Sequence, residues 1–249
     1  MSSLLGVPVD AAYHVVSALA NVLVPLLGGF AAVAGIILFT AAVRLAVTPL
    51  TFRALRGQAA QARLAPHVQR LRERYGKQPE RLQRELTALQ AREGTSLFAG
   101  FGPLLVQWPV FSVVYLLFRS PAIAGAPNRL LTGDLFGVPL GAHWLSGSAV
   151  LSVHGAVFVG VLALLGAACW LLARTARRVM PAIVPAKTGV PGATNPPAIP
   201  GWLTTVLPYL TVVIAAFAPL AAVIYLITST TWSAAERRLF AARARAAAR

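Results

Sequence analysis

One arginine stands inside a mostly apolar stretch of the chain. Arg44 lies within residues 30–52, roughly 12 Å from the end of that stretch at a helical rise of about 1.5 Å per residue. A buried arginine costs on the order of 2.5–3.5 kcal/mol in a bilayer, and no acidic residue lies in any predicted span to neutralise it. The side chain either extends to the inner headgroups or faces a water-filled cavity, where it offers positive charge to an anionic ligand.

Further polar side chains fall where they could share a groove with this arginine. Thr40 lies one helical turn before Arg44 and Thr48 one turn after it, so the three share a face. Gln107 stands in the middle of a second apolar stretch, where it either bonds a neighbouring helix or joins the groove. Tyr225, in the last stretch, is either a packing residue or a groove residue. Such a groove suits the passage of a polar peptide.

Nothing in the sequence has the spacing of a catalytic or metal site. We find no nucleophile–base pair, carboxylate pair or metal cluster. Cys169 is the single cysteine, and His154 is a lone histidine of the kind that usually bonds a neighbouring helix. We therefore predict no enzyme, no cofactor and no metal, and no dedicated nucleic-acid or small-molecule ligand.

The elements that position these residues are blocks of apolar sequence. Hydrophobic residues make up 57% of the 249 residues and charged ones only 12%, against about 25% in soluble domains. Several blocks reach the roughly 20 residues that a membrane-spanning helix needs. We predict an all-α polytopic membrane protein with five transmembrane helices around a polar groove. The predicted segments are an external N-terminus with an interfacial amphipathic helix (1–29), TM1 (30–52), a cytoplasmic basic helical hairpin (53–93), TM2 (97–118), an external loop (119–147), TM3 (148–173), a cytoplasmic Pro/Gly-rich loop (174–201), TM4 (202–216), TM5 (219–234) and a basic cytoplasmic tail (235–249).

Two of these assignments leave an alternative open. Residues 10–27 could be a first span instead of an interfacial helix. Residues 202–233 are too long for one span, so Pro208 and Pro219 favour two short spans with a tight turn near Ala218.

The hairpin between the first two spans is polar and basic. Leu82, Leu86 and Leu89 recur at helical spacing, and Pro79 suits the first turn of a second helix. The hairpin arginines that could contact an incoming chain or a ribosome are Arg70, Arg72, Arg74, Arg81 and Arg84. Alternatively, the positive charges only set the topology and touch anionic lipids.

Basic residues also predict the orientation. The chain has 22 Lys and Arg but only 7 Asp and Glu. Most of the basic residues fall in the hairpin, the Pro/Gly-rich loop and the tail. By the positive-inside rule these segments are cytoplasmic, with the N-terminus outside and an odd number of spans.

Four stretches in order resemble the YidC-type membrane protein insertases, the family that includes the mitochondrial Oxa and chloroplast Albino proteins. They are LFTAAVRLAVTPLTF (38–52), LAPHVQRLRERYGKQPERLQRELTALQAREG (64–94), GPLLVQWPVFSVVYLLF (102–118) and FAPLAAVIYLITSTTWSAAERRLF (217–240). The resemblance covers about residues 10–240.

The resemblance implies a mechanism. Five spans would enclose a groove open to the cytoplasm and to lipid, in which Arg44 attracts acidic residues of a substrate's external tail. Thr40 would face the substrate, Gln107 would line the groove and Tyr225 would fall in a substrate-contact region. The chain would act as an insertase or chaperone for nascent membrane proteins, as a monomer in the bacterial cell membrane, alone or with the Sec translocon, with the ribosome as a candidate partner.

The chain departs from the family pattern in the last span. Ser229-Thr230 stands where the family usually has Ser-Asn, and Glu236-Arg237 where it has a Gln pair. The short form resembles Gram-positive and actinobacterial members. Two alternatives stay open: a non-translocating assembly factor of the same fold, and a small-solute transporter, although the repeated halves typical of transporters are missing.

Overall fold

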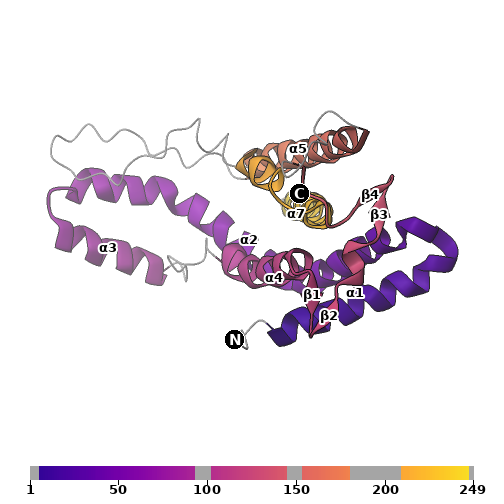
Figure 1. Ribbon diagram of the computed structural model, residues 1–249. Helices are drawn as coiled ribbons and strands as arrows, with labels where there is room; N and C mark the ends of the chain where they lie inside the picture. The colour runs from indigo at the N-terminus through magenta and orange to yellow at the C-terminus, as the bar shows by residue number, and fades with distance from the viewer. Residues whose placement is uncertain (1–5, 93–101, 145–152, 180–208, 247–249) are drawn as a thin grey trace.

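The structure is a computed structural model that describes residues 6–92, 102–144, 153–179 and 209–246. These residues are mostly helical, with two short β-hairpins (Figure 1). Two helical stretches among them, Gly6–Ala60 and Gly155–Ala176, are long and apolar enough to cross a membrane. The structure therefore agrees with an all-α membrane protein, whereas the five-span count remains a prediction.

The N-terminal helix folds back along the start of the second one. Helix α1 (Gly6–Leu27) is followed by the 3₁₀ turn η1 (Gly28–Phe30) and by α2 (Ala31–Tyr75), which lies beside it in Figure 1. The two backbones approach closely at Gly35, which has no side chain. A Cβ atom at this position would lie only 3.2 Å from the carbonyl oxygen of Val16. Small residues at such crossings are typical of helix packing in membranes.

Helix α2 continues without interruption past the predicted end of TM1 at residue 52. It runs for 45 residues and contains Pro49 and Pro66, so the boundary between span and hairpin is not a break in the helix. The predicted helix start at Pro79 is confirmed: α3 (Pro79–Arg92) begins there and runs back along the C-terminal half of α2 (Figure 1). Residue 52 is followed by good helix formers such as Ala54 and Leu55, which explains the continuity.

Helix α4 (Gly102–Arg119) leads into a segment that we predicted only as a loop. It holds the hairpin β1 (Ala122–Ile123)–β2 (Ala126–Pro127), the 3₁₀ turn η3 (Arg129–Leu131) and the hairpin β3 (Asp134–Leu135)–β4 (Val138–Pro139). Ile123 pairs with Ala126, and Leu135 pairs with Val138. Each two-residue turn ends in a glycine with positive φ, Gly125 or Gly137, which favours this hairpin geometry.

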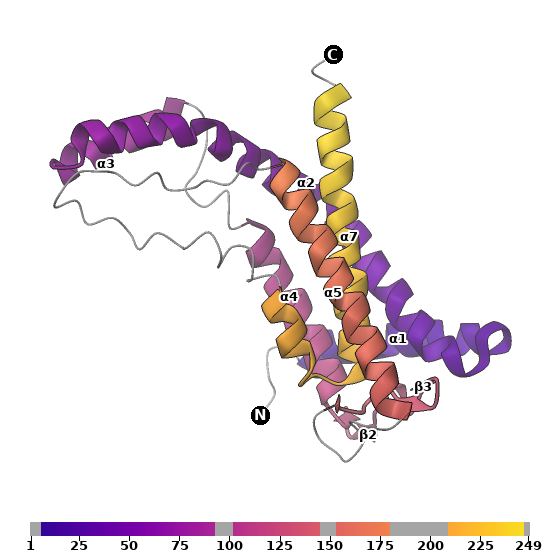
Figure 2. The ribbon, with the colours of Figure 1, turned by 90° about the horizontal axis from the view of Figure 1, so that it is seen from above.

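Helices α5 and α7 lie side by side, and a helical stretch over residues 209–215 lies between them in the sequence. Helix α5 (Val153–Val179) packs on α7 (Leu220–Ala246), and Figure 2 shows them running next to each other. Leu165 and Cys169 of α5 share a buried cluster with Val223 of α7. Two helices extend beyond the predicted segment ends: α5 runs to residue 179 instead of 173, and α7 runs to residue 246 instead of 234. Arginine has a high helix propensity, so the basic residues at these ends extend both helices instead of ending them.

The segment after β4 fixes the start of α7. The backbone N–H groups of Leu220 and Ala221 donate to the carbonyl oxygens of Ala142 and Leu140, at 3.0 and 2.9 Å. The first N–H groups of a helix have no partner within it, so these bonds replace a side-chain cap. A turn near Ala218 and Pro219, as predicted, precedes this helix.

Candidate functional site

Arg44 lies at the contact between α2 and α7. Its Nε donates a hydrogen bond of 3.0 Å to the hydroxyl oxygen of Ser229, and its Nη2 donates to the same oxygen. The arginine is half-buried and the serine is buried. Since a guanidinium has five N–H donors and one hydroxyl oxygen cannot use them all, Arg44 can also bind a carboxylate.

One turn further along α2, and one to two turns further along α7, three more side chains form a bonded cluster. Thr48 Oγ1 lies 2.7 Å from Glu236 Oε1 and 2.8 Å from its own helix's Arg44 carbonyl oxygen. Its single proton can serve only one of these acceptors at a time. Trp232 Nε1 donates to Glu236 Oε1 at 3.1 Å and to Thr48 Oγ1 at 3.3 Å. We call the group Arg44, Thr48, Ser229, Trp232 and Glu236 the polar seam.

Spacing along each helix explains why these residues meet. Arg44 and Thr48 are four positions apart on α2, whereas Ser229, Trp232 and Glu236 are three and then four apart on α7. Both spacings place the residues on one helical face. A charged side chain on an apolar helix needs polar partners when it is buried. The polar face of α7 provides these partners for the polar face of α2.

The pairing also gives the relative direction of the two helices. Arg44 and Ser229 are 185 positions apart, and Thr48 and Glu236 are 188 apart. Further along, the rings of Phe52 and Phe240 lie 6.2 Å apart. The residue numbers rise together on both helices, so α2 and α7 run parallel.

The structure brings four of the five predicted groove residues to this contact or next to it. Thr40 is 2% exposed and its hydroxyl donates to the carbonyl oxygen of Ile36 at 2.7 Å, within its own helix. Tyr225 is also 2% exposed, and it lies with Glu236 within electrostatic range of Arg44. Gln107 lies in α4, but its side chain is outside the described part of the structure.

Three members of the polar seam were missed as site residues. Trp232 gave no site signal in the sequence. Ser229 and Glu236 stood out in the sequence only as departures from the family pattern. We expected no acidic residue near Arg44 because the predicted last span ended at residue 234, whereas Glu236 lies one helical turn beyond Trp232 and is 3% exposed. The signal that could have found it is the spacing of Ser229, Trp232 and Glu236 on one face.

The predicted hairpin arginines lie in a different environment. The five are exposed: Arg70, Arg72, Arg74, Arg81 and Arg84. The guanidinium carbons of Arg74 and Arg81 lie 5.5 and 5.4 Å from the ring centre of Tyr75, so the ring holds arginines from both helices. Arg84 pairs with Glu80 at 4.0 Å.

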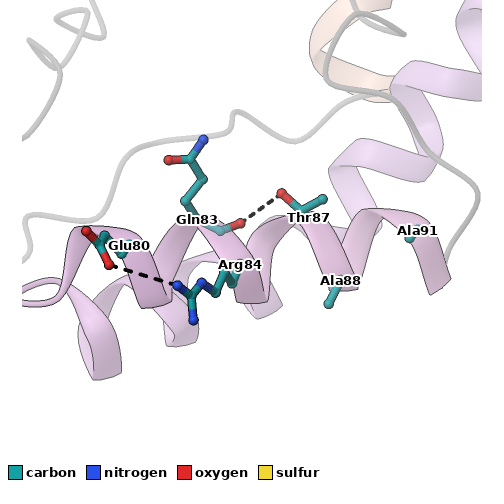
Figure 3. A pocket seen from close by; sticks show the side chains of 6 residues that line it. All are labelled: Glu80, Gln83, Arg84, Thr87, Ala88 and Ala91. Carbon is teal, nitrogen blue, oxygen red and sulfur yellow. Dashed lines mark hydrogen bonds and ion pairs between the residues drawn. The ribbon is translucent and has the colours of Figure 1, made fainter.

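An open hollow runs along α3 in this hairpin. Glu80, Gln83, Arg84, Thr87, Ala88 and Ala91 line it, and Figure 3 shows the Glu80–Arg84 pair at one end. Its lining is mostly exposed, so it lacks the desolvated polar groups typical of a ligand site. The polar seam is therefore the stronger candidate.

Beyond the seam, α7 continues as a basic helix packed on α2. Burial lowers the pKa of Arg237 from its ordinary value, and the neighbouring Glu236 carboxylate opposes that shift. The guanidinium carbon of Arg243 lies 5.3 Å from the ring centre of Phe52. These contacts attach the end of α7 to the middle of α2.

Fold and seam together define a helical membrane protein with an arginine held between two parallel helices. The family model described as 60Kd inner membrane protein, which represents the YidC/Oxa1 family, matches residues 23–246. The chain belongs to this family, which confirms the resemblance seen in the sequence.

Individual relatives agree with this assignment. The membrane protein insertase YidC of Granulibacter bethesdensis is 38% identical over 93 residues, which cover 37% of this chain and 16% of the relative. The protein of the same name from Ruegeria sp. is 31% identical over 149 residues, covering 55% and 24%. That from Clostridium perfringens is 30% identical over 101 residues, covering 41% and 42%. The chain thus aligns with less than half the length of each of these relatives.

Proposed function

We propose that this chain is a membrane protein insertase and chaperone of the cell membrane. It takes short hydrophilic tails of nascent membrane proteins toward Arg44 and releases the following hydrophobic segment to lipid. The observation that carries the proposal is the half-buried Arg44 guanidinium at the α2–α7 contact, in a chain of the YidC/Oxa1 family.

The energetics of Arg44 favour this role. A positive charge in an apolar helix is costly, so its position is best explained by an anionic partner that binds there. A carboxylate offers the guanidinium two oxygens and an opposite charge, which makes a stronger pair than the single neutral oxygen of Ser229. An acidic side chain in a substrate's tail would supply that partner. Because the attraction needs no bond to be made or broken, the proposed function involves no enzyme chemistry and no cofactor.

The direction of the helices supports the proposed topology. Two spans of one chain run parallel only if an odd number of crossings lies between them. Helices α2 and α7 run parallel, as expected for TM1 and TM5 with three spans between them. With the N-terminus outside, the seam's Glu236 end is its cytoplasmic end.

We propose that the hairpin meets the membrane surface or an incoming chain. Its exposed arginines present fixed positive charge, which attracts anionic lipid headgroups by about 1 kcal/mol per residue near the surface. Contacts with the Sec translocon or a ribosome would use the same face.

The test is insertion of a single-span protein with an acidic external tail into proteoliposomes. Arg44→Ala should lower insertion at least about tenfold, because it removes a charge-assisted hydrogen bond, whereas Arg44→Lys should stay within about threefold. Arg53→Ala is the matched control, since Arg53 is exposed on the same helix. Equal insertion by Arg44→Ala and wild type would show that the charge only anchors the helix.

One observation favours a second candidate, the non-translocating assembly factor. Ser229 already accepts hydrogen bonds from Arg44, so the arginine has a role in holding α2 against α7 without any substrate. Such a factor would bind membrane proteins without inserting them. It becomes the better description if the wild-type protein inserts none of the test substrates but still delays their aggregation.

A further inference from the structure

Glu236 is a buried carboxylate whose contacts leave one oxygen unused. It is 3% exposed, and Oε1 accepts hydrogen bonds from Thr48 and Trp232. Oε2 is fully buried and has no hydrogen-bond partner among the described residues. A buried carboxylate oxygen without a partner is costly, so its presence calls for a role beyond packing.

The position of Glu236 relates it to Arg44. Both side chains lie in the same seam, joined through Thr48, which bonds Glu236 and follows Arg44 by one turn. Glu236 is also within electrostatic range of the guanidinium. In the proposed topology it lies on the cytoplasmic side of Arg44, where a tail entering from the cytoplasm would pass.

We propose that Glu236 is a resident counter-anion that competes with the acidic tail of a substrate for Arg44, and so selects tails with several acidic residues. This inference rests on the proposed insertase function. A carboxylate of the chain lowers the positive potential that a tail meets at Arg44, and it repels an approaching carboxylate. A tail with one acidic residue then gains little, whereas a tail with several gains enough attraction to Arg44 to outweigh the repulsion by Glu236.

The first measurement is binding of labelled tail peptides to the full chain in detergent. The peptides carry one aspartate, three aspartates or asparagine in their place, and fluorescence anisotropy gives each Kd. Glu236→Gln keeps the shape and removes the charge, so it should tighten the one-aspartate peptide about fivefold and leave the asparagine peptide unchanged. Glu236→Asp keeps the charge and should bind like wild type.

Two controls make the result specific. Asp10→Asn removes a carboxylate from α1, away from the seam, and should change no Kd. Adding Arg44→Ala to Glu236→Gln should abolish the gain, because the competition is for that guanidinium. Should the Gln variant fail to fold, Glu236→Met removes the same charge with a side chain that needs no hydrogen bond.

The outcomes separate this inference from the proposed function. Unchanged binding of the one-aspartate peptide by Glu236→Gln, or a gain that persists without Arg44, would overturn the role of Glu236. In proteoliposomes, wild type should insert the three-aspartate substrate well and the one-aspartate substrate poorly, and the Gln variant should insert both. If no variant inserts either substrate, the insertase proposal fails, and the peptide affinities still decide whether Glu236 competes for Arg44.

Discussion

The polar seam and the α2–α3 hairpin both depend on arginine, in opposite surroundings. In the seam, one half-buried arginine bonds a buried serine, with a buried glutamate nearby. In the hairpin, five arginines are exposed, and two of them lie against the ring of Tyr75. The difference shows that the surroundings of an arginine, more than its presence, decide what its charge can do.

Desolvation accounts for the contrast. Exposed charges are screened by water and salt, and single pairs such as Glu80–Arg84 contribute at most about 1 kcal/mol. Groups at a buried contact must be satisfied by neighbours, so losing one partner costs more. We therefore expect substitutions in the seam to affect stability more than matched substitutions in the hairpin.

The largest effect should follow from placing a bulky apolar side chain in the seam. Ser229→Leu removes the acceptor of Arg44 and overfills a buried position, which should lower the free energy of unfolding by about 3 kcal/mol. Thr87→Leu, at an exposed position of α3, should change it by less than about 0.5 kcal/mol. Titration with a denaturing detergent, followed by circular dichroism, measures both. Similar losses in the two variants would contradict the contrast.

A smaller effect should come from removing one hydrogen bond. Trp232→Phe keeps an aromatic ring but deletes the Nε1 donor to Glu236, and should cost about 1 kcal/mol. Trp170→Phe is the matched control, because Trp170 is exposed on α5 with Arg174 over its ring. The same detergent titration applies. If both variants unfold at the same detergent concentration as wild type, the hydrogen bond from the indole does not stabilise the seam.

The smallest effect should be confined to the hairpin. Tyr75→Ala removes the ring that Arg74 and Arg81 share, which should cost about 0.5–1 kcal/mol per contact locally. Hydrogen exchange of the α3 amides should accelerate, while Tyr75→Phe, which keeps a ring, should exchange like wild type. Faster exchange in α7 as well would mean that the two regions are energetically coupled.

Sequence patterns predicted the local features that depend on nearby residues. The shared face of Arg44 and Thr48, the helix start at Pro79 and the turn near Ala218 all follow from spacing or from proline, and the structure has them. The apolar blocks likewise predicted helices at α2 and α5.

Features that depend on packing could not be predicted in this way. Hydropathy ended the last span at residue 234, so Glu236 was assigned to the tail, although α7 continues and buries it. The partner of Arg44 is 185 positions away, a pairing that no local pattern contains. The β-hairpins after α4 were missed because the residues before their glycines, Ala124 and Phe136, are not the usual ones for such turns.

The continuity of α2 has a mechanical consequence. At about 1.5 Å per residue, its 45 residues form an arm roughly 68 Å long that connects the seam to the hairpin. Pro49 and Pro66 each lack a backbone N–H, so each removes one bond of the helix and creates a joint where bending is easiest. Arg44 and Thr48 lie before the first joint. The contacts of Phe52 with Phe240 and Arg243 hold α2 against α7 beyond Pro49. A load on the hairpin would therefore bend α2 mainly at Pro66, while the register of α2 against α7 stays fixed.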